Sequence, residues 1–510
     1  MGQIKTIRIV CYAVNGGGVG HLTRLVAISR WIRRYAAHAD TPAEIYFLTS
    51  SEADGLLFHE RFASFKLPSK TVVGEAGIDK IAYLALAKQW VWHSLGLLRP
   101  DLLVVDTFPR GSFGELLSAL DLCARRAFIY RPLKDSFAGR ADFQAMLPLY
   151  DAILVPEEEE DAPVRVPADA AAKVRWTGPV LARERCEMLP RADARARLGI
   201  PDGRLAVYVS AGGGGDPAAE RHILDVHAAI GGDPDLHLVI GAGPLYRGRV
   251  LGGERLTWFS QVGAAELMPA FDLAVCAAGY NTFGELMYAG VPAVFLPQDK
   301  IADEQDVRAD RAVRAGAARR GDVAAAVAAW RDPAARSAAS AAARSLVPQN
   351  HARDAAGELL RLVLGADAVA AAEEAVGDEV LVAARETGVA VGDAIELLRL
   401  CGPAAEETLR WSITQGIPVG AVLRAASALV RKVVAADLAA RGRAVRRVLE
   451  ALSPFGDWPA AVALLKSFHP TRALSPDALA GEIELFLDGL RARREDLYRG
   501  IAALTAEGWQ

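Results

Sequence analysis

The chain has 510 residues, of which 52% are hydrophobic and 24% are charged, and this is the composition of an ordinary globular protein rather than a disordered one. Its 58 basic and 62 acidic residues give a net charge of −4, which predicts that nucleic acid is not a partner. The five cysteines lie far apart without metal-ligand spacing, so we expect free buried thiols and no metal site.

The first 180 residues alternate between strand and helix patterns. Short apolar runs rich in β-branched residues predict strands over 7–14, 44–50, 101–108, 125–131 and 151–156. A helical pattern over 22–35 follows the first of these runs. Strands that alternate with helices predict a parallel sheet with helices on both faces, so we expect a Rossmann-like, acceptor-side domain over residues 1–180.

The same alternation restarts in the second third of the chain. Apolar runs predict strands over 204–210, 236–243, 272–279 and 291–297, and a helix over 282–289 lies between the last two. We therefore expect a second doubly wound α/β domain over residues 181–365. Open α/β sheets bind ligands at the carboxyl ends of their strands, so two such domains predict a binding cleft.

Beyond residue 366 the strand patterns stop and helical patterns dominate, for example over 394–400, 421–438 and 479–492. Asp393 and Ser475 are the predicted N-caps. We expect an all-helical region over 366–510, which is a candidate site for a protein partner. Two interpretations stay open: a cut near Gly365 releases a separable module, or this region packs an apolar face against the α/β domains.

No segment is typical of secretion or of a membrane span. The first eight residues lead into an apolar strand without a cleavage site, and no run of about 20 apolar residues lacks a charge, so we expect a soluble, cytoplasmic protein. The segment 81–98 holds Trp90, Trp92 and several leucines. Core packing is the simpler interpretation, and an acceptor-facing patch or a peripheral membrane contact is the alternative.

A glycine-rich loop joins the first predicted strand to the first helix. Glycines let a ligand approach the backbone and a helix N-terminus favours anions, so Gly18, Gly20 and Arg24 are candidates for a phosphate or acceptor contact. His21 begins the helix, where it can accept a proton from a sugar hydroxyl. The alternative is that His21 only makes a local hydrogen bond at the helix start.

Asp106 ends the third predicted strand, where it can orient His21 and stabilise the imidazolium. A helix N-cap or a salt bridge is the alternative role for Asp106. In the second domain, Gly212, Gly213 and Gly214 follow a strand and expose backbone amides that suit a diphosphate. No Gly-Lys-Ser/Thr follows them, which excludes a P-loop.

The segment 278–286 is the most specific in the chain. Gly279, Asn281 and Thr282 stand where a helix begins, which predicts an anion site. Glu285 follows one turn later and can accept two hydrogen bonds from a ribose diol. A solvated helix residue is the alternative for Glu285.

Residues 5–365 resemble glycosyltransferases of the B fold, and the second domain is similar to the family 28 C-terminal domain. That family binds its nucleotide sugar with a Gly-x-x-x-x-x-Glu segment, an Ala-Gly-x-Pro turn and a downstream glutamine. Gly279, Glu285, the turn at 289–292 and Gln305 match these motifs. In a B fold, residues 349–364 would form the helix that crosses back to the first domain.

A group of bacterial predicted glycosyltransferases is more similar still. The shared motifs include G-x-G-H-x-x-R at 18–24, P-D-L-L-x-V-D-x-F-P-R-G at 100–111, K-V-R-x-T-G at 173–178 and S-x-G-G-G at 210–214. Tyr280 and Arg308 depart from the peptidoglycan N-acetylglucosaminyltransferase of family 28, which argues against its acceptor. The segment 105–108 instead resembles natural-product transferases, in which a histidine base pairs with such an aspartate.

The resemblance implies an inverting, metal-independent hexosyltransferase that needs no cofactor. Its donor would be a nucleotide diphosphate sugar, UDP-linked, and its acceptor an unidentified small molecule, glycan or lipid. A nucleotide-sugar 2-epimerase on the same fold is one alternative, although its Ser-Gly-Gly-x-Gln-Glu-Glu stretch is absent at 278–282. A non-catalytic nucleotide-sugar-binding scaffold is the other.

Overall fold

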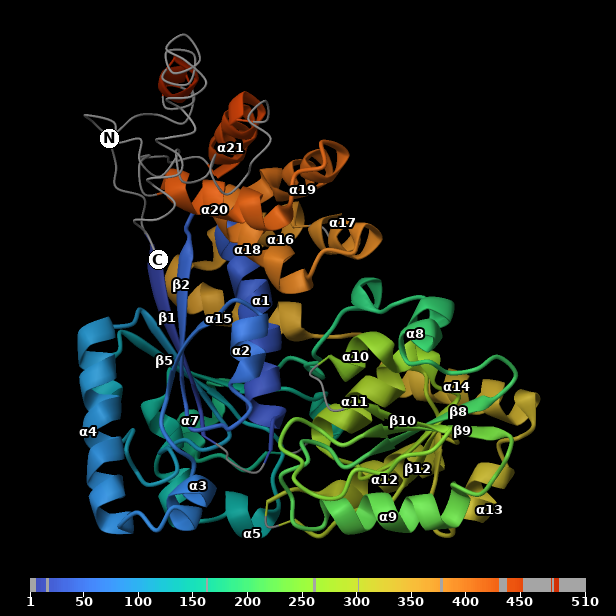
Figure 1. The fold of residues 1–510 in the computed structure, drawn as a ribbon. Coiled ribbons are helices and arrows are strands. Elements are labelled where there is room, and N and C mark those ends of the chain that lie inside the picture. Colours follow the sequence, from blue (N-terminus) through green and yellow to red (C-terminus); the bar gives the residue numbers. More distant parts are fainter. Residues whose placement is uncertain are drawn as a thin grey trace. The chain divides into compact units, whose positions relative to one another are not determined.

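The computed structural model describes residues 6–14, 18–161, 164–259, 263–300, 302–376, 379–430, 438–452, 478 and 481–485. It divides into two compact units (Figure 1). The α/β unit comprises Arg8–Trp31 and Ile45–Val363, and the helical unit comprises Met1–Ile7, Ile32–Glu44 and Leu364–Gln510. The structure contains two sheets, as the sequence predicts, and this confirms the fold class.

The first sheet has seven strands in the order β3-β2-β1-β4-β5-β6-β7. Their bounds are β1 Ile7–Ala13, β2 Ala43–Thr49, β3 Ala63–Lys66, β4 Leu102–Asp106, β5 Arg125–Ile129, β6 Ala152–Val155 and β7 Val174–Trp176. β1 and β4 are parallel neighbours, with Tyr12 opposite Val105. The chain therefore leaves β1 and β4 at the same edge of the sheet, at the point where the strand order reverses. Ligands bind at such a point in open α/β sheets.

The second sheet repeats this arrangement with six strands in the order β10-β9-β8-β11-β12-β13. Their bounds are β8 Leu205–Ser210, β9 Leu236–Gly241, β10 Leu256–Phe259, β11 Leu273–Cys276, β12 Ala293–Phe295 and β13 Ala318–Arg319. β8 and β11 are parallel neighbours, with Ser210 opposite Cys276. The glycines after β8 and the helix start after β11 are thus brought to one edge.

Helices cover both faces of each sheet, as alternating strands and helices predict. In Figure 1, α1 (Gly20–His38) and α4 (Lys80–Leu98) lie on opposite faces of the first sheet, and α9 (Ala219–Ile230) and α11 (Tyr280–Ala289) on opposite faces of the second. The remaining helices of the α/β unit are α2 Gly55–His59, α3 Lys70–Glu75, α5 Asp135–Ala138, α6 Ala141–Gln144, α7 Ala168–Ala171, α8 Arg191–Arg197, α10 Ala264–Leu267, α12 Gln305–Arg314, α13 Val323–Ala328, α14 Pro333–Leu346 and α15 Ala352–Leu364.

The predicted strands are all present, but β3, β7, β10 and β13 were not predicted. These strands are short and lie at or near the sheet edges, and β3 is exposed throughout. Strands buried on both faces are continuous apolar runs, whereas an edge strand needs no such run, so the pattern misses it. β4 shows the contrast, because every one of its residues is buried.

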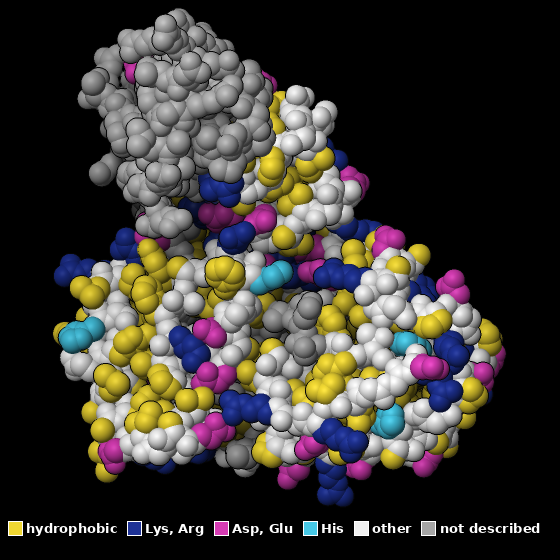
Figure 2. Space-filling model, viewed as in Figure 1, with side chains coloured by type: hydrophobic (Ala, Val, Ile, Leu, Met, Phe, Trp, Pro, Cys, Tyr) yellow, Lys and Arg dark blue, Asp and Glu magenta, His cyan; other side chains and the backbone are white. Residues whose placement is uncertain are grey.

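α4 presents two faces, so the segment 81–98 is both a core stripe and an exposed surface. Tyr83, Ala87, Val91 and Leu95 are buried at four-residue spacing. Trp92 and Leu97 are exposed on the other side, and Figure 2 shows hydrophobic side chains over α4 among charged ones. Every helix in the described part of the chain is too short or too polar to span a bilayer.

The described residues beyond 365 are helical, as predicted. The helices are α16 Ala366–Ala375, α17 Glu379–Thr387, α18 Val391–Cys401, α19 Ala405–Thr414, α20 Val419–Val430 and α21 Leu438–Leu452. The prediction that Asp393 is an N-cap was wrong, because α18 begins earlier and Ala390 occupies its N-cap position. Asp393 lies in the first turn of α18, where a carboxylate is favourable. Ser475 and most of 479–492 lie outside the described residues.

The boundaries predicted at 180 and 365 stay predictions, because the structure groups the two sheets as one unit. It also counts residues 32–44, far from 366–510 in sequence, with the helical unit. Arg33 at the end of α1 lies 3.6 Å from Glu396 of α18, between Nη1 and Oε2. Ile32 and Tyr35 of the same helical turns are almost completely buried.

Ending the chain at Gly365 is therefore expected to destabilise the remainder, because residues 32–44 lose the helices they are grouped with. Exposed apolar patches favour aggregation. We expect the shortened protein to form aggregates on size-exclusion chromatography or to unfold at a lower temperature than the full chain. A monodisperse shortened protein with an unchanged thermal midpoint would instead support the separable module.

Candidate active site

A pocket of about 540 Å³ lies at the carboxyl ends of both sheets in the α/β unit. It is lined by the loops that follow β1, β8 and β11. All of the predicted site residues except Asp106 line it: Gly18, Gly20, His21, Arg24, Gly212, Gly213, Gly214, Gly279, Asn281, Thr282, Glu285 and Gln305. The two glycine loops, distant in sequence, thus meet at one pocket.

His21 and Asp106 form a buried pair at the pocket wall. Nδ1 of His21 lies 2.6 Å from Oδ1 of Asp106, and Nη1 of Arg24 donates to Oδ2 at 2.6 Å. A carboxylate can only accept, so the bond places the imidazole hydrogen on Nδ1. This leaves Nε2 as the ring atom able to take a proton.

The electrostatics of the pair favour a neutral imidazole beside a charged carboxylate. Burial lowers the pKa of His21 below its usual value, and Arg131 and Arg24 add to this, although Asp106 opposes it. Burial alone would raise the pKa of Asp106, but Arg24 and His21 lower it to about 2. His21 is therefore deprotonated near neutral pH, as a general base must be.

Thr107 also contacts Asp106, and no sequence motif predicted this contact. Its φ is +63°, a left-handed conformation that is rare for a β-branched residue and costs about 1–3 kcal/mol. In this conformation Oγ1 of Thr107 donates to Oδ1 of Asp106 at 2.5 Å, and the Thr107 amide donates to the Ile129 carbonyl. Backbone strain thus lies next to the predicted catalytic pair.

The loop after β8 requires glycine at Gly214. Its φ is +80°, and a Cβ there would lie 2.3 Å from the carbonyl oxygen of Ala242. Gly213 lies against the other glycine loop, because its Cβ would be 3.2 Å from the Val19 amide nitrogen. The backbone, rather than side chains, therefore forms this wall of the pocket.

α11 supplies the polar groups on the facing wall. Gly279 is its N-cap, and Nδ2 of Asn281 donates to the Gly20 carbonyl at 3.3 Å, which ties α11 to α1. Glu285 lies one turn further in and is partly buried. Burial raises the pKa of Glu285 to about 7, although Arg183 lowers it.

Gln305 is buried and holds the loop before α12. Its Oε1 accepts from the Gln298 amide at 2.9 Å, and its Nε2 donates to Asp303 at 3.3 Å. Asp303 also pairs with Arg131 from the loop after β5 and with Arg308. Arg131 and Asp303 both line the pocket, and neither was among the predicted site residues.

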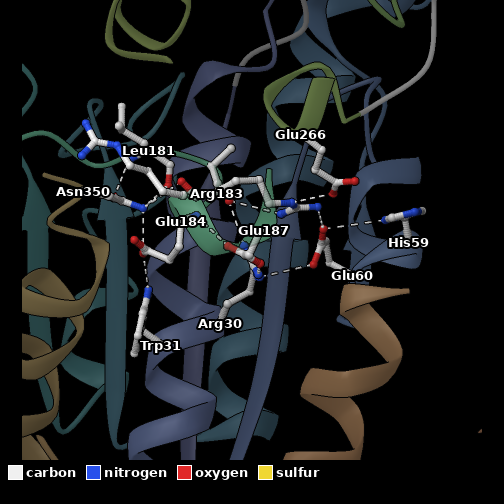
Figure 3. Close-up of polar contacts among 12 residues, drawn as sticks. Arg30, Trp31, His59, Glu60, Leu181, Arg183, Glu184, Glu187, Glu266 and Asn350 are labelled. Carbon is white, nitrogen blue, oxygen red and sulfur yellow. Dashed lines mark hydrogen bonds and ion pairs between the residues drawn. The ribbon is translucent and has the colours of Figure 1, made fainter. Parts of the chain in front are cut away.

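Arg183 lines the pocket too, at the centre of a buried ionic network (Figure 3). Its Nη2 donates to Oε1 of Glu60, the residue just after α2, and its Nε lies 2.8 Å from Oε1 of Glu266. Arg30 of α1 forms an ion pair with Glu187. Its Nε also lies 3.5 Å from Oε2 of Glu60. The network therefore holds Arg183, which lines the pocket, between the carboxylates of Glu60 and Glu266.

The start of α15 packs on the segment that joins the two sheets. The Asn350 side chain accepts from the Leu181 amide at 2.9 Å and donates to Glu184 at 2.8 Å. Glu184 also accepts from the indole of Trp31 in α1 at 3.0 Å, as Figure 3 shows. The last helix of the α/β unit is thereby connected to the first.

Replacing Glu60 by glutamine should destabilise the α/β unit, because Arg30 and Arg183 then share a site without their common carboxylate. Breaking a buried ion pair from one side costs about 3 kcal/mol or more. We expect a clearly lower midpoint of urea unfolding. Glu266→Gln is the matched control: it removes a partly exposed partner of the same arginine, so its loss should be smaller. Equal midpoints for Glu60→Gln and wild type would contradict the network's importance.

Part of the chain is similar to known glycosyltransferases. Residues 255–326 match the glycosyltransferase family 28 C-terminal domain. The chain is 30% identical over 173 residues to an uncharacterized glycosyltransferase of Methanopyrus kandleri, which covers 34% of this chain and 48% of the relative. It is 36% identical over 141 residues to a UDP-N-acetylglucosamine–N-acetylmuramyl-(pentapeptide) pyrophosphoryl-undecaprenol N-acetylglucosamine transferase of Salinibacter ruber, which covers 24% of this chain and 35% of the relative.

The chain thus spans less than half the length of these curated relatives. Among solved structures, the spinosyn forosaminyltransferase SpnP superimposes with a TM-score of 0.51 at 15% identity, covering 70% of this chain and 100% of that one. That likeness establishes the fold, and the family match covers residues 255–326, which include β11 and α11. The chain therefore has the glycosyltransferase B fold, and its residues 255–326 are similar to the family 28 C-terminal domain.

Proposed function

We propose that this protein is a glycosyltransferase that moves a sugar from a nucleotide diphosphate sugar to an acceptor hydroxyl. One observation carries the proposal: an oriented, neutral histidine faces the same pocket as the glycine loop and helix start of the family 28 domain. A binding-only scaffold would not need a base held by Asp106. The half of the pocket at His21 therefore suits an acceptor, and the half at the second sheet suits a donor.

The donor would lie against the second sheet. The amides of Gly212–Gly214 and the N-terminus of α11 offer hydrogen bonds and a positive dipole end to the diphosphate. Glu285 would accept hydrogen bonds from the ribose hydroxyls. A uridine nucleotide is our first choice, because the Salinibacter ruber relative is named for a UDP-linked donor.

In the reaction, Nε2 of His21 would take the proton from the acceptor hydroxyl as its oxygen attacks the anomeric carbon. The bond from that carbon to the diphosphate oxygen breaks, and the leaving nucleoside diphosphate keeps the electron pair. A single displacement of this kind inverts the anomeric centre. Asp106 would stabilise the imidazolium, and backbone amides the leaving group, so the proposed step uses no metal.

Nucleotide affinity should depend on pH through Glu285. The carboxylate is the form that accepts both ribose bonds, and with a pKa of about 7 it is mostly protonated at pH 6. UDP affinity should therefore be constant above pH 8 and fall about tenfold per unit below pH 7. Calorimetry on Glu285→Gln should show weaker UDP binding at pH 8. The remaining pH dependence of its affinity should come only from the titration of UDP itself. Exposed Glu254→Gln is the control, and parallel profiles for wild type and Glu285→Gln would exclude this role.

Turnover should depend on His21 more than donor binding does. His21→Ala should lower the rate by about 10² to 10⁴ with donor affinity close to wild type, since it removes only the base. Asp106→Asn should act in the same direction with a smaller loss. Because the lowered pKa of His21 keeps it neutral, wild-type turnover at saturating donor should be flat above neutral pH and fall in acid.

The measurement is release of nucleoside diphosphate from a panel of uridine, thymidine and guanosine diphosphate sugars. His93→Ala on the exposed face of α4 is the matched histidine control. Full turnover of His21→Ala would place the base elsewhere.

A further inference from the structure

A second pocket of about 460 Å³ lies beside the first in the α/β unit, and Phe108 lines both. The Phe108 ring centroid is 5.5 Å from that of His21 and 6.1 Å from that of Phe137. Phe137 and Phe143 continue the aromatic wall. The second pocket therefore begins one aromatic ring away from the proposed base.

Cationic side chains also line this pocket. Lys70 at the start of α3, Arg110 after β4 and Arg140 before α6 all line it. Asp142 also lines the pocket and forms ion pairs with both arginines. Its Oδ2 lies 2.9 Å from Nη2 of Arg110 and 3.0 Å from Nη2 of Arg140. One carboxylate thus serves two guanidiniums with five N–H donors each, so donors remain for a ligand.

Lys70 adds a further charge to the same wall. Its Nζ donates to the Ser112 carbonyl at 3.2 Å and lies 4.1 Å from the ring centroid of Phe113. Neither of these two contacts is to a carboxylate. Burial lowers the pKa of Lys70, and Lys80 and Arg110 act in the same direction against Glu115. The pocket therefore carries an excess of positive charge.

The loop that contains Arg110 is held in place by the side chain of Glu115. Gly111 has φ +79°, and a Cβ there would lie 2.3 Å from the carboxylate carbon of Glu115. That carboxylate accepts from the Ser112 and Phe113 amides at 2.9 and 2.6 Å, and also from the Tyr12 hydroxyl. The Phe-Pro-Arg-Gly segment at 108–111 is thus a hydrogen-bonded turn shortly after β4, the strand that ends at Asp106.

We propose that this second pocket receives the acceptor, and that the acceptor carries an anionic group beside an apolar moiety. The anion would be bound by Arg110 with Lys70 and Arg140, and the apolar moiety would pack on Phe108, Phe137 and Phe143. The inference rests on the proposed function, because it takes His21 as the base that the acceptor hydroxyl must reach. Guanidiniums bind both phosphate and carboxylate through paired hydrogen bonds, so either group fits this chemistry.

Three small probes test the pocket on the full chain: phenyl phosphate, benzoate and neutral benzyl alcohol, each titrated by calorimetry. We expect an anionic probe to bind at least about tenfold more tightly than benzyl alcohol, as charge-assisted hydrogen bonds require. Tighter binding of phenyl phosphate would indicate a phosphorylated acceptor, and tighter binding of benzoate a carboxylated one.

The variant Arg110→Gln should weaken the anionic probe about tenfold and leave benzyl alcohol unchanged, and Arg140→Gln should weaken it less. Arg125→Gln, an exposed arginine at the start of β5, is the matched control. Titration with UDP in the same samples should give wild-type affinity for every variant, which also shows that each is folded.

Equal binding of the three probes, or anion binding that is insensitive to Arg110, would overturn the anionic acceptor. Absence of UDP binding by the wild-type protein would instead contradict the proposed donor site, while Arg110-dependent anion binding stood. The two failures are therefore distinguishable.

Discussion

The buried carboxylate of Asp106 is the group on which the rest of the pocket depends. It accepts hydrogen bonds from His21, Arg24 and Thr107, and a buried charge without such partners would cost several kcal/mol. Arg24 also lies 4.6 Å from the ring centroid of Tyr280 in α11. Arg24, which bonds Asp106, therefore also connects α1 to α11.

This arrangement follows from the order of the strands. β1 and β4 are neighbours in one sheet, and β8 and β11 are neighbours in the other, so each sheet opens at its carboxyl edge where its order reverses. Asn281 and Gly213 both come close to the loop after β1, one through a side-chain hydrogen bond and the other through bare backbone. Larger residues at the glycines would keep these loops apart.

The fold was predictable because the central strands are buried on both faces and are therefore unbroken apolar runs. β3 and β10 lack that signal, and the cap of α18 was misplaced because Asp393 is favourable in a first turn as well as at a cap. Site residues on motifs, such as Gly214 and Glu285, were predictable in position. Arg183 and Arg131 were not, because their acidic partners Glu60 and Asp303 lie 123 and 172 residues away in sequence.

The most direct test of the account is a crystal structure of the full chain with UDP. We expect the diphosphate on the amides of Gly212–Gly214 and the start of α11, the ribose hydroxyls on Glu285, and His21 facing the place where a donor sugar would be attacked. A nucleotide bound outside this pocket, or one in it that leaves Glu285 and the glycine loop untouched, would contradict the proposed function.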